Sequence, residues 1–179
     1  MARNSTLNET EFWANVRDLE TAVEKLTSEN QATAHDGARW FMSAIYDAGR
    51  TLELHPEWAT QPAWRDFIEK SAPILVKRIL EFSRFYQDST DVLEREWEWG
   101  EEWIGVCRDW SSAQFVRELY GDRLDPPFHY FSENDDYLDD LRAQGEKHGP
   151  VRPQEIPEGI PPSHWWWWYP NPPGAVQAS

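Results

Sequence analysis

A proline pair stops the helical part of the chain within the segment DPPFHYFSENDDYLDDLR, residues 125–142. Neither ring nitrogen of Pro126–Pro127 can donate a hydrogen bond, and each ring excludes the α region for the residue before it. Three aromatic side chains follow in the next four positions: Phe128, Tyr130 and Phe131. Behind them, Ser132 is expected to cap a short acidic helix. We therefore predict an extended strip that packs on this chain or on a partner, with these three aromatic residues as partner-binding residues.

Upstream of this segment, apolar residues recur at helical spacing. Asn8 with Glu11 forms a capping-box pattern before a predicted helix over residues 9–29. Its apolar face consists of Phe12, Val16, Leu19, Val23 and Leu26, at spacings of four, three, four and three. A second helix is predicted over residues 35–54, and His55-Pro56 ends it.

A third helical region opens at Gln61-Pro62 and contains Pro73 inside an apolar pattern. Because proline is best tolerated in the first turn of a helix, Ser71 is expected to cap a fresh helix there. The apolar stripe of that helix is Leu75, Val76, Ile79, Leu80, Phe82 and Phe85.

A fourth helix is predicted to start at Ser89 and to carry a tryptophan-rich face as far as Trp110. It either continues or restarts at Ser111, and Gly121 stops it. No run shows the alternation of a strand bounded by turn residues. The predicted fold class is all-α, an irregular bundle of about five to seven helices with an extended C-terminal tail rich in proline and tryptophan.

The composition divides the chain into a helical domain over residues 1–148 and a tail over residues 149–179. Eight of the 13 prolines lie between Pro150 and Pro173. Such a segment tends to extended conformations, yet it holds four consecutive tryptophans, Trp165–Trp168. Four adjacent indoles in water would promote aggregation. We predict a docking tail whose partner-binding residues are Trp165, Trp166, Trp167 and Trp168, and the alternative is a tail that packs on its own domain.

The charge excludes several classes of partner. A formal net charge of −15, from 32 acidic and 17 basic residues, disfavours nucleic acid and anionic membrane surfaces. One cysteine, Cys107, cannot form an internal disulfide, which suits a reducing compartment. The N-terminal residues contain no apolar run, and no stretch approaches the ~20 apolar residues of a membrane span. A cytoplasmic location is expected.

The sequence predicts no catalytic, cofactor-binding or metal-binding residues in this chain. None of the five histidines has glutamate three positions earlier, so the Glu-x-x-His pairs of a diiron bundle are missing. No His-x-x-x-His pair, phosphate-binding glycine loop or nucleophile elbow occurs. Cys107 has acidic neighbours that would raise its pKa, so it is interpreted as a buried apolar residue.

Four glutamates in the tryptophan-rich helix share one helical face: Glu94, Glu98, Glu101 and Glu102. A metal site would need further ligands, and no histidine is in register. A solvated acidic face is the favoured interpretation, and contact with a basic partner is an alternative.

Two regions resemble the γ subunit of the hydroxylase component of soluble methane monooxygenase and related soluble diiron alkane and alkene monooxygenases. The first is the opening helix, where Trp13 and Asn15 are followed by Glu24-Lys25. The second follows the proline pair, where Tyr130-Phe131 leads to Leu138, Leu141 and Arg142. The resemblance covers roughly residues 9–152; the tryptophan-rich helix and the tail depart from the family pattern.

The resemblance implies an accessory subunit without catalytic residues of its own. In that family, the hydroxylase is a dimer of three-subunit protomers, and the α subunit holds the diiron centre that inserts oxygen from O2 into hydrocarbons, with electrons from NADH. The γ subunit is helical and lies outside α and β. Two alternatives stay open: a free-standing acidic binding protein of the immunity or inhibitor type that masks a basic surface, and a small helical enzyme with an unrecognised site.

Overall fold

The computed structural model of the chain describes residues 8–82, 100–124 and 135–171. Within these ranges every regular element is helical, which confirms the predicted all-α class. The long helices are α1 (Glu9–Leu26), α2 (Gln31–Leu54), α3 (Pro62–Lys77), α5 (Gly100–Tyr120) and α7 (Asp135–His148). Short 3-10 helices are η1 (Pro56–Thr60), η2 (Gly121–Leu124), η3 (Pro153–Glu155) and η4 (Trp165–Trp167).

The first two helices begin at asparagine caps. The side chain of Asn8 accepts a hydrogen bond of 3.0 Å from the backbone N–H of Glu11, which confirms the predicted start of α1. Asn30 caps α2 in the same way, so α2 begins four residues before the predicted position. Gly37 lets the helices approach closely, because a Cβ there would lie 2.9 Å from the backbone oxygen of Ala22.

The predicted break at Ser71 is wrong. Helix α3 continues through Pro73 to Lys77, and the hydroxyl of Ser71 contacts the carbonyl of Phe67 and the hydroxyl of Tyr120, each at 2.7 Å. A proline inside a helix costs roughly 3 kcal/mol. The buried side chains on either side of it, including Ile68 and Leu75, supply packing that outweighs this local cost. The predicted apolar stripe also divides, because Leu75 and Phe82 are buried whereas Leu80 is 72% exposed.

Helix α5 runs unbroken through Ser111, so the continuous alternative is the correct one. It ends at Tyr120, and Gly121 follows with a positive φ of 52°, as its predicted stop position requires. The predicted part of this helix before Gly100 lies outside the described residues, as do Ser132 and the aromatic strip at Phe128, Tyr130 and Phe131.

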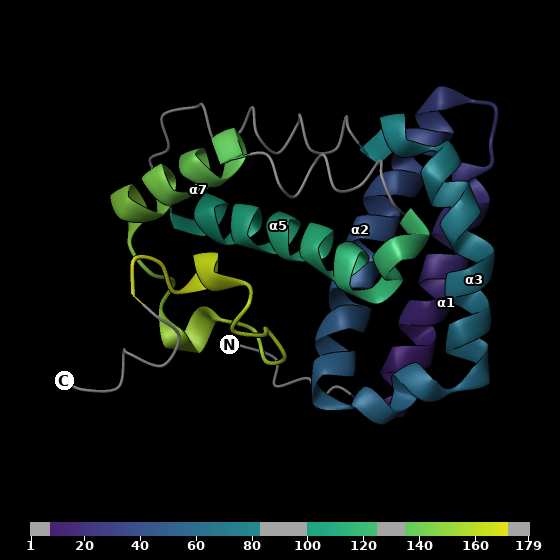
Figure 1. Ribbon diagram of the computed structural model, residues 1–179, viewed down its shortest axis with the longest axis horizontal. Helices are drawn as coiled ribbons and strands as arrows, with labels where there is room; N and C mark the ends of the chain where they lie inside the picture. Colours follow the sequence, from purple (N-terminus) through teal and green to yellow (C-terminus); the bar gives the residue numbers. More distant parts are fainter. Residues whose placement is uncertain (1–7, 83–99, 125–134, 172–179) are drawn as a thin grey trace.

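Two apolar cores share α5. The first lies among α1, α2, α3 and the C-terminal part of α5, where Ala113, Val116 and Tyr120 are buried. The second contains the N-terminal part of α5, Leu141 of α7 and two tail residues, Trp166 and Trp167. Figure 1 shows α5 running from α2 and α3 to the half of the molecule that holds α7 and the tail. Helix α5 buries residues toward both cores, whereas Gly105, Arg108 and Glu118 lie on its exposed side.

Among the described residues, every helix is too short or too polar to traverse a lipid bilayer.

Candidate functional site

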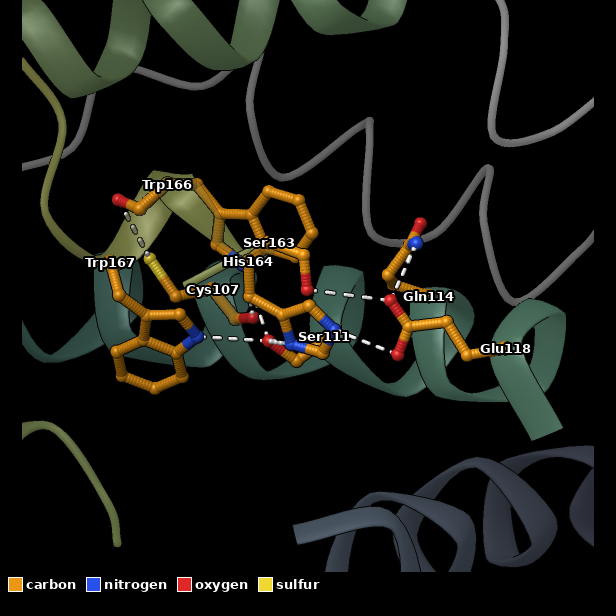
Figure 2. Close-up of polar contacts among 8 residues, drawn as sticks. All are labelled: Cys107, Ser111, Gln114, Glu118, Ser163, His164, Trp166 and Trp167. Carbon is orange, nitrogen blue, oxygen red and sulfur yellow. Dashed lines mark hydrogen bonds and ion pairs between the residues drawn. The ribbon is translucent and has the colours of Figure 1, made fainter. Parts of the chain in front are cut away.

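The tail folds back onto α5 and encloses a buried polar cluster. Gly149, with a φ of 74°, follows the end of α7. The chain then returns so that the backbone N–H of Val151 donates to the carbonyl of Trp167 at 3.0 Å. Residues of the tail lie against the middle of α5, and Figure 2 shows the side chains of Ser163, His164, Trp166 and Trp167 next to those of α5. The tail is thus part of the folded unit over residues 149–171.

The four consecutive tryptophans divide into two pairs. Trp167 is fully buried and Trp166 is 4% exposed, both within this chain, whereas Trp165 and Trp168 are half-buried at the surface. The prediction that all four tryptophans bind a partner is therefore corrected for Trp166 and Trp167, which belong to the second core of this chain. The physical reason is that α5 presents an apolar face long enough to cover them, so the alternative of a tail packed on its own domain holds for this pair.

The hydroxyl of Ser111 is the centre of the cluster. The indole nitrogen of Trp167 donates to Ser111 Oγ at 2.8 Å, and that of Trp166 approaches it at 3.3 Å while donating to the carbonyl of Cys107 at 2.9 Å. The imidazole Nδ1 of His164 lies 3.0 Å from the same oxygen. Ser111 and His164 are both fully buried. One side chain of α5 thereby binds three ring nitrogens of the tail.

The chemistry of these groups assigns a tautomer to His164. An indole nitrogen is a donor only, so both tryptophans use acceptor capacity on Ser111 Oγ. The serine hydrogen is then free to be donated to Nδ1 of His164, which must be unprotonated to accept it. This leaves the ring hydrogen on Nε2, which faces Oε2 of Glu118 at 3.6 Å. The neutral Nε2–H form satisfies the most groups in the cluster.

Glu118 closes the cluster on the side of α5 that is nearer to solvent. Its Oε1 accepts from Gln114 at 2.9 Å and from Ser163 at 3.4 Å, as Figure 2 shows. Burial raises the pKa of this carboxyl, but the close contact with His164 and the hydrogen bonds from Gln114 and Ser163 outweigh burial and lower it below the ordinary range. The pKa of the nearby Glu53 is raised, first by its own burial and then by the charge of Glu118. Glu118 is thus held as a fixed anion beside His164.

The combination of Ser111, His164 and Glu118 has the residue types of a hydrolytic triad but not its arrangement. A nucleophilic serine must meet substrate, and it gives its proton to a histidine whose other nitrogen is held by a carboxylate. Here the serine is fully buried, and two indole N–H groups already occupy its oxygen. A substrate could not approach Ser111 without displacing the tail. The arrangement fixes the tail to α5.

Cys107 is buried in the same region, which confirms its interpretation as an apolar residue. It is fully buried, and its Sγ lies 3.9 Å from the carbonyl of Trp166. Burial raises the pKa of this thiol well above its ordinary value, so it stays protonated and unreactive.

Outside the cluster, three further contacts fix the tail to the helices. The side chain of Arg50 on α2 donates to the carbonyl of Glu158 at 2.7 Å. Gly159 packs against the same helix with a φ of 80°, and a Cβ there would collide with the backbone oxygen of Arg50. The hydroxyl of Tyr169 donates to Glu146 of α7 at 3.1 Å. The tail therefore contacts α2, α5 and α7.

The sequence did not predict the cluster residues Ser111, His164 and Glu118. Ser111 and Glu118 are seven positions apart, which places them on one face of a helix, but any two polar residues at that spacing share this property. His164 lies 53 residues beyond Ser111, so only the fold brings them together. The one local feature that could have indicated the cluster is the run of ring nitrogens in His164 and the tryptophans that follow it.

The predicted partner-binding residues lie partly outside the described ranges, partly at the surface and partly in the core. Phe128, Tyr130 and Phe131 lie outside the described residues. Trp165 is half-buried, and the guanidinium of Arg142 lies 5.6 Å from its ring while also pairing with Asp139 at 2.6 Å. Within the described ranges, no group of three or more histidine, cysteine, aspartate or glutamate side chains is arranged to hold a metal ion.

Comparison of the chain with protein-family models, with curated proteins and with solved structures finds no match.

Proposed function

We propose that this chain is a non-catalytic γ-type accessory subunit of a soluble multicomponent diiron hydroxylase that oxidises hydrocarbons with O2 and electrons derived from NADH. The observation that carries the non-catalytic part is the environment of Ser111, whose hydroxyl is fully buried and surrounded by three ring nitrogens. A serine hydroxyl and a histidine imidazole, which are catalytic groups in many enzymes, here fix the tail to α5. That use supports a role in assembly.

The partners in this proposal are the α and β subunits of the hydroxylase, in a dimer of three-subunit protomers, with the diiron centre in α. The resemblance in α1 and α7 carries this part. Lys25 pairs with Asp36 at 2.6 Å and lies 3.5 Å from the ring centre of Trp40, so one residue of the resemblance ties α1 to α2. A rigid helical surface of this kind suits a subunit that stabilises larger chains.

The residues proposed to contact the partners are Phe128, Tyr130, Phe131, Trp165 and Trp168. Trp165 and Trp168 keep part of their indole surface exposed. Half-buried tryptophans at a surface are typical of interface anchors.

One observation favours a second candidate, a free-standing acidic binding protein. The tail buries Trp166 and Trp167 without any partner chain, so the described fold is self-contained. A monomer that masks a basic surface would need no more than this fold and the net charge of −15.

The deciding experiment is purification of the full-length chain, tagged at its N-terminus, from cells that express its neighbouring genes. We expect stoichiometric recovery with two larger chains, one of which carries iron and Glu-x-x-His pairs. The complex should hydroxylate a short alkane when a reductase and NADH are added. Recovery as a 21.1 kDa monomer, or with a basic protein that lacks iron, would contradict the proposal and support the second candidate.

A further inference from the structure

A cleft of about 370 Å³ lies where α3, η1, η2 and the C-terminal part of α5 meet. Its apolar wall consists of Ala59, Trp64, Ile68 and Leu119. Its charged residues are Arg65, Glu69, Glu118 and Arg123. A concave site of this size, with apolar and charged side chains side by side, can hold a small molecule. None of the sequence patterns pointed to it.

The two arginines of the cleft differ in what they are free to bind. Arg123 donates to Oε1 of Glu69 through both Nε and Nη2, at 2.7 and 2.6 Å. The guanidinium of Arg65 makes no hydrogen bond or ion pair with the described residues, although it carries five N–H donors. Such a group beside an apolar wall suits a planar carboxylate. Among the described residues that line the cleft, Arg65 is therefore the cation available to a ligand.

Glu118 supplies a fixed negative charge to the same cleft. Gln114 and Ser163 donate to its Oε1, which leaves Oε2 with only the longer contact of 3.6 Å to His164. An ammonium group of a ligand could donate to Oε2 without breaking the cluster. The cleft thus combines a free guanidinium, a positioned carboxylate and an apolar wall.

The net charge of the chain decides between ligand classes. A simple anion would be repelled by a protein of charge −15, and a simple cation would be repelled locally by the guanidinium of Arg65. We propose that the cleft binds a small zwitterion with an apolar side chain, the class of free α-amino acids. Its carboxylate contacts Arg65, its ammonium contacts Glu118, and its side chain lies on Trp64, Ile68 and Leu119.

The test is a titration of the full-length chain with L-leucine, followed by the indole N–H signal of Trp64 in nitrogen-15 NMR spectra. We expect saturable shifts with a dissociation constant on the order of 1 mM, as is usual for a ligand of this size. N-acetyl-L-leucine lacks the ammonium and L-leucinamide lacks the carboxylate, so each should bind about tenfold more weakly than leucine.

Two variants assign the contacts. Arg65→Gln should weaken leucine about tenfold and leave leucinamide unchanged, whereas Arg39→Gln, on the exposed surface of α2, should change neither. Glu118→Gln should weaken leucine and leave N-acetyl-leucine unchanged, with the indole signals of Trp166 and Trp167 as the check that the tail stays in place. No shift at Trp64 up to 10-fold above ~1 mM leucine, or equal binding of leucine by wild type and Arg65→Gln, would overturn the proposal.

Discussion

The hydroxyl of Ser111 illustrates how one small side chain can determine the position of a distant segment. It lies in the middle of a helix that would be equally regular with alanine at this position. Its oxygen accepts from indole nitrogens and its hydrogen is donated to His164, so the cluster leaves no donor of Trp167 unpaired in the interior. A buried polar group costs little when it is fully hydrogen-bonded and much when it is not.

Replacing Ser111 by alanine should therefore destabilise the chain by roughly 2–4 kcal/mol, because the indole N–H of Trp167 and the Nδ1 of His164 both lose their partner in the interior. The free energy of unfolding in urea is the measurement. The neighbouring Ser112→Ala is the matched control, since the Ser112 hydroxyl bonds only to the carbonyl of Arg108 one turn earlier. That control should change stability by less than about 0.5 kcal/mol. Equal effects of the two substitutions would show that the cluster does not hold the tail.

The tail is the element whose observed role differs most from the role predicted from its sequence. It lacks long regular structure, yet it covers the N-terminal part of α5, where Trp103, Val106, Cys107 and Trp110 are buried. Short 3-10 turns and the hydrogen bond from the Arg50 side chain of α2 to the carbonyl of Glu158 hold it in place. It is a structural layer of the second core.

Truncation after Gly149 should expose that layer and destabilise α5. Each buried tryptophan removed from a core costs roughly 3–5 kcal/mol, so the loss of Trp166 and Trp167 exceeds what a marginal helix can tolerate. We expect reduced helical circular dichroism and binding of a hydrophobic dye, in contrast to full-length protein. Helical content that stays unchanged after truncation would show that the tail lies on the surface without stabilising α5.

A single substitution provides a milder version of the same test. Gly159→Ala places a Cβ against the carbonyl of Arg50 at a positive φ, so it should loosen the tail and lower the melting temperature. Gly105→Ala is the control, because a Cβ at that helical position meets no atom within 4 Å and should be neutral or stabilising.

In the part of the chain that the structure describes, α5 joins two cores, and each core contains a buried tyrosine. Tyr46 is in the second core and Tyr120 is in the first. Burial raises the pKa of Tyr46 to about 12, because the ionised form would lose its hydration; the charges of Arg50 and Arg108 act in the opposite direction but are weaker. Burial also raises the pKa of Tyr120, and its bond to Ser71 only partly opposes this.

These shifts predict loss of stability at alkaline pH. A group whose pKa is raised on folding contributes its full stability below its unfolded pKa, near 10 for tyrosine, and loses it as the pH rises toward the folded value. The free energy of unfolding should therefore fall between pH 10 and about pH 12, by about 1.4 kcal/mol per pH unit for each buried tyrosine. Tyr46→Phe keeps the ring, so urea unfolding at several pH values should show a shallower decline in that variant. Identical declines would mean that Tyr46 ionises freely in the folded state.

Local sequence patterns were enough to predict the helical class, the start of α1 and the ends of α2 and α5. Asn8 marked the start of α1, Gly121 the stop of α5, and the apolar spacing of Phe12, Val16 and Leu19 the face that is buried. These features depend on capping, glycine conformation and helical periodicity, which act within a few residues of each other. They can be interpreted without knowing what lies across the fold.

The roles of Pro73, Ser111 and the tail tryptophans depend on contacts between distant parts of the chain. Local preference ended a helix before Pro73, but packing on both sides of it keeps α3 continuous. Local composition made residues 165–168 a docking segment, but α5 offers Trp166 and Trp167 an apolar face and a serine hydroxyl 55 and 56 residues away in sequence. Burial free energy depends on which surfaces meet, and that is settled by the arrangement of whole elements, which no spacing along the chain records.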